Sequence, residues 1–126
     1  MEAASLANGL GEAWRSAARE APAELFRALA DPTRRRLLEH LVSSPSSAGE
    51  LASRLGLPRV NVSHHLGVLA EAGLIDLRGR RAAVRPDALT RLRRYFDMAL
   101  TTAAISAPDM SRSVAREAQN PTNQIS

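Results

Sequence analysis

The stretch "ELASRLGLPRVNVSHHLGVLAEAGL" at residues 50–74 decides the fold, because it predicts two short helices separated by a very tight turn. The first helix carries Leu51 and Leu55 on its apolar side and ends at Gly56, a residue type that commonly follows the last turn of a helix. The second helix is expected over residues 58–72. Helix, tight glycine turn and helix together form a helix-turn-helix.

The segment before this stretch is also predicted to be helical. Asp31 is suited to cap a helix and Pro32 to occupy its first position. The apolar side chains of this helix recur at helical spacing and are expected to face the core; they are Leu37, Leu38, Leu41 and Val42. Arg34, Arg35 and Arg36 point in three directions from the same helix and are interpreted as mostly structural.

The segment after it predicts a hairpin and a further helix. In "LIDLRGRRAAVRP", residues that favour strands flank Arg78-Gly79-Arg80, which is typical of a short hairpin with a basic tip. Residues 86–105 keep a helical apolar register, and residues 10–20 do so near the N-terminus. The pattern therefore predicts a mainly α fold, a winged helix-turn-helix with a short two-stranded β-hairpin wing and with dimerisation helices at both ends.

Three parts of the chain follow from this pattern. They are an N-terminal helical extension at residues 1–21, a winged helix-turn-helix domain for DNA binding and dimerisation at residues 22–105, and a flexible tail at residues 106–126. The tail is assigned from its polar composition.

The helix at 58–72 is expected to turn a polar face outward. At about 100° per residue, Val62, Leu66 and Leu69 fall on the core side. The opposite side suits a DNA major groove, where arginine can pair with guanine, polar side chains can reach base edges, valine can meet a thymine methyl and glycine allows close approach. Its members are Arg59, Val60, Asn61, Ser63, His64 and Gly67. The alternative is an ordinary solvated helix surface.

His64 and His65 are adjacent, which raises the question of a metal site. Neighbouring positions on a helix do not face each other. His64 is expected to point outward and His65 to lie at the margin of the buried side, so a metal ion shared by the two rings is disfavoured.

The charge of the chain points to a polyanionic partner. Arginine supplies all 17 basic residues against 13 acidic ones, for a net charge of +4, although the absence of lysine is also compatible with a bias in genomic base composition. Arg78, Arg80 and Arg81 cluster at the hairpin, where phosphate contact is favoured over a merely solvated turn. Double-stranded DNA is the expected partner.

Other classes of function find little support. The chain has no cysteine nucleophile, no Gly-rich phosphate loop and no arrangement of carboxylates suited to catalysis, so we do not expect an enzyme. It also has no apolar run of membrane-spanning length and no signal-peptide pattern. We expect a cytoplasmic protein without membrane contact.

The segments "LFRALADPTRRRLLEHL", "ELASRLGL" and "VNVSHHLGVLAEAGLI", with the hairpin after them, resemble the ArsR/SmtB family of bacterial winged-helix repressors over about residues 22–104. The resemblance implies a homodimer that binds an inverted-repeat operator with two recognition helices and releases it when an effector binds. It also implies that the hairpin arginines follow the DNA backbone. The residues that match positions entering the major groove are Arg59, Val60, Ser63 and His64.

The familiar metal sites of that family lack their ligands in this chain. Ser47 and Gly49 stand where metal sensors carry Cys-x-Cys, and residues 86–105 hold no histidine for the second site. No metal ligands are therefore predicted. A weak, atypical divalent transition-metal site using His40 and carboxylates stays open, although His40 is better interpreted as a cation near a helix end. The effector, whether a metal ion, a small molecule, a partner protein or none, also stays open.

The last helix carries more apolar surface than internal packing requires, which predicts a homodimer interface. Its predicted members are Trp14, Leu25, Leu92, Phe96 and Leu100. The alternative to DNA binding is a winged-helix protein-interaction module, in which the exposed stripe and the basic wing bind a partner protein.

Overall fold

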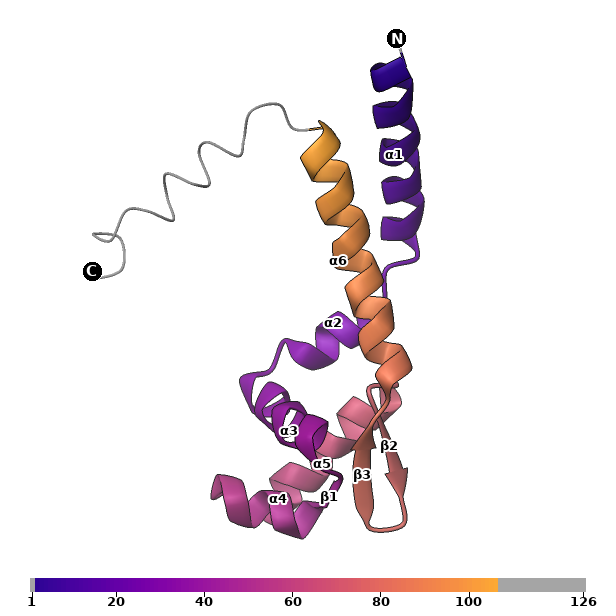
Figure 1. The fold of residues 1–126 in the computed structure, drawn as a ribbon. Helices are drawn as coiled ribbons and strands as arrows, with labels where there is room; N and C mark the ends of the chain where they lie inside the picture. Colours follow the sequence, from indigo (N-terminus) through magenta and orange to yellow (C-terminus); the bar gives the residue numbers. More distant parts are fainter. Residues whose placement is uncertain (1, 107–126) are drawn as a thin grey trace, which may run out of the picture. The chain divides into compact units, whose positions relative to one another are not determined.

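The computed structural model describes the backbone of residues 2–106 and the side chains of residues 9–106. Its elements are α1 (Glu2–Arg19), α2 (Ala23–Leu29), α3 (Pro32–Ser43), β1 (Ser46–Ser47), α4 (Ala48–Leu55), α5 (Arg59–Glu71), β2 (Ile75–Arg78), β3 (Arg81–Val84) and α6 (Pro86–Ser106), as labelled in Figure 1. The tail predicted at 106–126 lies outside the described residues from position 107 onward. None of the helices in the described part of the chain has an apolar stretch that could span a lipid bilayer.

The described chain separates into two units. One is continuous and covers residues 21–95, while the other combines residues 2–20 with residues 96–106. Helix α1 is longer than the helix expected at 10–20. The apolar spacing begins only at Leu10, but the preceding residues include alanine, leucine and glutamate, which have high helix propensity.

The winged helix-turn-helix expected from the sequence is confirmed in the continuous unit. Helices α4 and α5 are joined through Gly56 and are followed by the β2–β3 hairpin. The wing is not a two-stranded hairpin, as expected, but part of a three-stranded antiparallel sheet. Strand β1 pairs with β3, and the strand order is β1-β3-β2. Ser46 of β1 is buried, and its hydroxyl donates to the carbonyl of Ser44 at 3.1 Å. A run of serines and a proline gives no strand pattern, so the sequence predicted only a helix break there.

The core of the continuous unit is aliphatic and draws on α2 to α6 and the hairpin. Leu37, Leu38 and Leu41 of α3 are buried as predicted, but Val42 is 60 % exposed. Val42 lies about 90° round the helix from the centre of the buried side, which places it beyond the core. The buried aliphatic residues are Leu25, Ala28, Leu37, Leu38, Leu41, Leu51, Ala52, Val62, Leu66, Leu69, Leu74, Ile75, Ala82, Ala88 and Leu92.

Two residues predicted for the dimer interface belong to this core instead. Leu25 is 1 % exposed and Leu92 is 8 % exposed, so neither has appreciable surface left to bury against a second copy. That part of the prediction is wrong. The apolar spacing predicted that these side chains are buried. It could not show whether they are buried in the core of the chain or against a second copy.

The start of α3 is held by the cap that the sequence predicted. Asp31 accepts hydrogen bonds from the backbone N–H groups of Thr33 at 2.8 Å and Arg34 at 3.1 Å, and Pro32 occupies the first helical position. The bond from the Arg34 N–H is the largest cause that lowers the pKa of the Asp31 carboxyl below its usual range. An ionised Asp31 therefore favours the folded chain.

Arg34 and Arg35 turn back from α3 and cap the end of α2. Arg34 Nε donates to the carbonyl of Ala28 at 2.6 Å and its Nη2 to the carbonyl of Arg27 at 3.3 Å, while Arg35 Nη1 donates to the carbonyl of Leu29 at 2.7 Å. The last carbonyls of a helix have no partner within it. The structural role expected for this arginine run is confirmed for these two residues.

Replacing Arg34 by alanine is expected to lower the free energy of unfolding by about 1.5–3 kcal/mol, because carbonyls at the end of α2 lose a charged donor. Arg36→Ala is the matched control: Arg36 is exposed on the same helix, and its loss should cost no more than about 0.5 kcal/mol. Urea unfolding of both variants measures the difference. Equal losses would show that the bonds of Arg34 do not hold α2 and α3 together.

Candidate nucleic-acid interface

Helix α5 has a buried side and an outward side. Val62 and Leu69 are 0 % exposed and Leu66 is 4 % exposed, so these three side chains fix the rotation of the helix on the core. Val60, by contrast, is 79 % exposed. The residues proposed for the major groove all lie away from the core: Arg59, Val60, Asn61, Ser63 and His64 are exposed, and Gly67 is half-buried.

The turn between α4 and α5 brings Arg59 to the start of the outward side. Gly56 has φ 65° and ψ 38°, a left-handed conformation that glycine adopts without steric cost. The N–H of Leu57 donates to the carbonyl of Ala52 at 3.0 Å and closes the end of α4. A Cβ placed on Gly49 would be 4.0 Å from the guanidinium carbon of Arg59, so this side chain lies beside the first turn of α4.

His64 and His65 occupy different surroundings. His64 is exposed, whereas His65 is half-buried and its Nδ1 has no hydrogen-bond partner among the described residues. Their ring centroids are 5.7 Å apart, with 59° between the ring planes. An electrostatic interaction with His65 is the smallest of the causes that lower the pKa of Asp31, and the largest is the hydrogen bond from the Arg34 N–H. In the part of the chain that the structure describes, no three His, Cys, Asp or Glu side chains gather to hold a metal ion.

The three wing arginines have different partners. Arg80 is exposed beside Gly79, which has φ 61° in the turn, and within the described residues its side chain forms no hydrogen bond or ion pair. Arg78 is 83 % exposed and lies 3.6 Å from the carboxylate of Asp76. The wing thus presents Arg80 without a competing partner and Arg78 with a weak one.

Arg81 instead anchors the wing, a role that the sequence did not indicate. Its Nη2 donates to the carbonyl of Pro45 at 2.9 Å, and its Nη1 lies 3.5 Å from Glu50 Oε1 at the start of α4. Its side chain is still 57 % exposed. Phosphate contact by Arg81 stays a prediction.

Arg85 was also missed, and it fastens the base of the hairpin. The guanidinium of Arg85 lies 3.2 Å from the carboxylate of Asp87 and 3.7 Å from that of Asp76. The backbone N–H of Arg85 donates to the carbonyl of Leu74 at 2.8 Å. The hydrogen bond to Asp87 is the main cause that raises the pKa of Arg85 and lowers the pKa of Asp87. These contacts link β2, the end of β3 and the start of α6.

Comparisons with known proteins agree with this geometry. A family model described as a helix-turn-helix domain matches residues 29–78. The HTH-type transcriptional regulator Rv2034 of Mycobacterium tuberculosis is 41 % identical over an alignment of 88 residues, and the match covers 64 % of this chain and 82 % of that protein. The HTH-type transcriptional regulator CmtR of the same species is 53 % identical over 53 residues, 42 % of this chain.

The match to CmtR covers 45 % of that protein, so the chain spans about half the length of this relative. Among solved structures, an ArsR-like transcriptional regulator from Rhodococcus sp. RHA1 is 30 % identical with a TM-score of 0.53. The match covers 81 % of this chain and 93 % of that one. Over most of its described length, the chain is therefore similar to regulators of this type in both sequence and fold.

Replacing Arg81 by alanine is expected to speed amide hydrogen exchange in β1 and β3 about fivefold, the effect of losing about 1 kcal/mol of local stability. Arg78→Ala is the control, because among the described residues its side chain forms only a single exposed ion pair, worth about 0–1 kcal/mol. Exchange followed by NMR at neutral pH measures both variants. The same acceleration in both would show that Arg81 does not anchor the wing.

Proposed function

The chain belongs to the ArsR family of helix-turn-helix transcriptional regulators, and from this premise we propose that it binds a specific DNA operator through α5 and the wing. It acts by binding rather than by catalysis, and it acts in the cytoplasm, where bacterial DNA is found. Repression of a nearby promoter is the expected outcome. The observation that carries the proposal is the outward side of α5, which is polar, exposed and fixed by the three buried side chains opposite it.

In the proposed complex the N-terminal half of α5 enters the major groove. Arg59 donates two hydrogen bonds to guanine, Asn61 and Ser63 reach base edges or phosphates, and His64 donates to guanine N7 or a phosphate. Val60 contacts a thymine methyl. Apart from the backbone of α5 and the neighbouring residues, no atom of the described residues lies within 4 Å of the place where a Cβ on Gly67 would lie. A DNA strand can thus approach the helix backbone at that position.

The wing supplies contacts that do not depend on sequence. The guanidinium of Arg80 has no competing partner among the described residues and is the first candidate for a phosphate, followed by Arg78 and then by Arg81. Such contacts position a protein on the duplex without specifying bases.

A homodimer would bring two copies of α5 to the two halves of an operator. Phe96 is 57 % exposed and Leu100 is 70 % exposed, one helical turn apart on α6. Large exposed apolar side chains at that spacing support a contact with a second copy. Trp14 is half-buried in the same unit. With Leu25 and Leu92 assigned to the core, the proposed interface is formed by Trp14, Phe96 and Leu100.

Selection from a random duplex library is expected to return an inverted repeat with half-sites about one helical turn, roughly 34 Å, apart. If the dimer neutralises about six phosphates, the logarithm of its affinity should fall against the logarithm of salt with a slope near −5. Fluorescence anisotropy with the selected and a scrambled duplex measures both. Equal affinity for the two duplexes would contradict specific recognition. Co-purification of one stoichiometric protein without DNA retention would favour the interaction module instead.

Single substitutions separate groove contacts from backbone contacts. Arg59→Ala and His64→Ala are expected to lose about 1–3 kcal/mol of preference for the selected duplex, because base contacts disappear. Arg80→Ala should weaken binding to both duplexes alike and reduce the salt slope by about 1. Arg36→Ala, an exposed arginine on α3, is the charge-matched control. Uniform losses from all three test variants would show that the groove assignment is wrong.

A further inference from the structure

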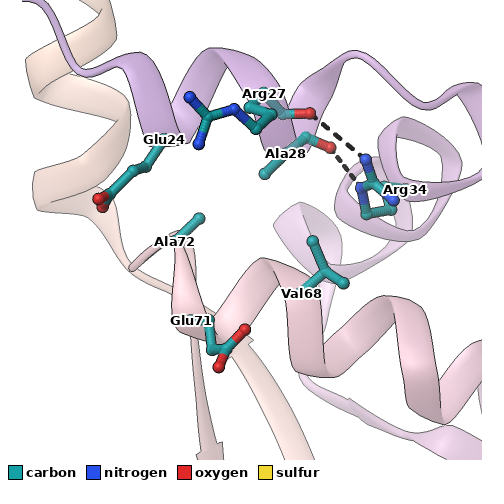
Figure 2. A pocket seen from close by; sticks show the side chains of 7 residues that line it. All are labelled: Glu24, Arg27, Ala28, Arg34, Val68, Glu71 and Ala72. Carbon is teal, nitrogen blue, oxygen red and sulfur yellow. Dashed lines mark hydrogen bonds between the residues drawn. The ribbon is translucent and has the colours of Figure 1, made fainter.

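A cavity of about 460 Å³ lies between α2, the start of α3 and the C-terminal end of α5. Figure 2 shows the residues that line it: Glu24 and Arg27 come from α2, and Glu71 and Ala72 come from the end of α5. The volume falls within the range of cavities that hold small molecules. The lining residues are Glu24, Arg27, Ala28, Arg34, Val68, Glu71 and Ala72.

The cavity is lined by side-chain charges of both signs that have no partner among the described residues. Glu24, Arg27 and Glu71 are exposed at the rim, and their charged groups form no hydrogen bond or ion pair there. Arg34 is different, because its guanidinium already donates to the carbonyls of Ala28 and Arg27, drawn as dashed lines in Figure 2, and lies 3.8 Å from Asp31. One cationic group and two anionic groups are thus available to a ligand.

The remaining lining is apolar and lies beside a helix end. The side chains of Ala28, Val68 and Ala72, which lie between the charged residues, are aliphatic. Helix α5 ends at Glu71, with Ala72 as its C-cap. The C-terminal end of a helix carries partial negative charge and favours a nearby cation. Glu71 and this helix end therefore form the side of the cavity that suits an ammonium group.

We propose that this cavity binds a small zwitterion, a molecule with an ammonium group, a carboxylate and a short apolar side chain. The ammonium faces Glu71 and Glu24, the carboxylate faces Arg27, and the side chain covers Ala28 and Ala72. A simple cation would place a positive charge next to Arg27. A simple anion would place a negative charge next to both glutamates. Free amino acids are the chemical class that carries all three features.

Because of the position of the cavity, a ligand bound there can change the affinity of the chain for DNA. Val68, Glu71 and Ala72 belong to the C-terminal end of the helix whose N-terminal half we assign to the major groove. A ligand that fastens this end to α2 and α3 biases the placement of α5, and any change in DNA affinity must be matched by an equal change in ligand affinity. This coupling rests on the proposed function, whereas ligand binding itself does not.

L-valine and two analogues test the binding. Isobutylamine lacks the carboxylate of L-valine, and isovalerate lacks its ammonium group. Titration of the ¹⁵N-labelled full chain should shift the amides of residues 24–28 and 68–72 with a Kd on the order of 1 mM for L-valine. Each analogue should bind at least about tenfold more weakly, because one charged group is unmatched. No shift at these amides, or equal binding of either analogue, would overturn the proposal.

Three variants test the site. Arg27→Gln should remove the preference for L-valine over isobutylamine. Glu71→Gln should reduce the preference for L-valine over isovalerate, because Glu24 still faces the ammonium group. Ala72→Leu, at a half-buried position, should occupy the place assigned to the apolar side chain of the ligand and abolish the shifts while the rest of the spectrum keeps its folded pattern. Glu39→Gln removes an exposed carboxylate of α3 outside the cavity and is the control. Retained L-valine binding in Ala72→Leu would overturn the assignment to this cavity.

The regulatory part has a separate readout. Affinity for the selected duplex should change at least about threefold on adding saturating L-valine, and the Ala72→Leu variant should show no such change. An unchanged affinity would overturn the regulatory role and leave the binding site standing. If the chain bound no DNA at all, the proposed function would fail, and the amide shifts would still decide whether the cavity binds the zwitterion.

Discussion

Burial of three aliphatic side chains on α5 is the constraint on which the rest of the structure depends. Val62, Leu66 and Leu69 are at most 4 % exposed, and they hold one side of the helix against a core made almost wholly of leucine and alanine. An α-helix anchored on one side must present the other side outward. The rotation of α5, and with it the position of every polar side chain proposed for the groove, is therefore set by packing and not by the polar residues themselves.

Arginine side chains form the hydrogen bonds and ion pairs that connect the elements of this small unit, which its aliphatic core cannot form. Arg34 caps α2 from α3, Arg81 joins the wing to the start of α4, and Arg85 ties the base of the hairpin to α6. A guanidinium has several donors in a fixed plane, so one side chain can serve two acceptors on different elements. A chain whose basic residues are all arginine can thus use some of them for its own fold and leave others, such as Arg80, for an external anion.

The repeating pattern of α5, the cap at Asp31 and the glycine turn were predictable because each leaves a signature in residue type and spacing. The contacts that Arg34 and Arg81 make between elements were not predictable, because both side chains bind backbone carbonyls, which every residue carries. The short strand β1 was missed for the same reason: its pairing with β3 is made by the backbone of two serines. Outward positions on α5 could be assigned from spacing, whereas the cavity behind its C-terminal end depends on how three helices pack.

The apolar residues of α6 show that spacing predicts which side chains share one side of a helix but not which of them are buried in the core. Leu92 and Phe96 are one turn apart on the same stripe, yet Leu92 is 8 % exposed and Phe96 is 57 % exposed. The stripe continues as the helix passes from one unit of the chain to the other, and the core of the continuous unit covers only its first part. Leu100, one turn further on, is 70 % exposed. Side chains that already lie in a core cannot also form a contact between copies, so any homodimer contact made by this stripe must begin after Leu92.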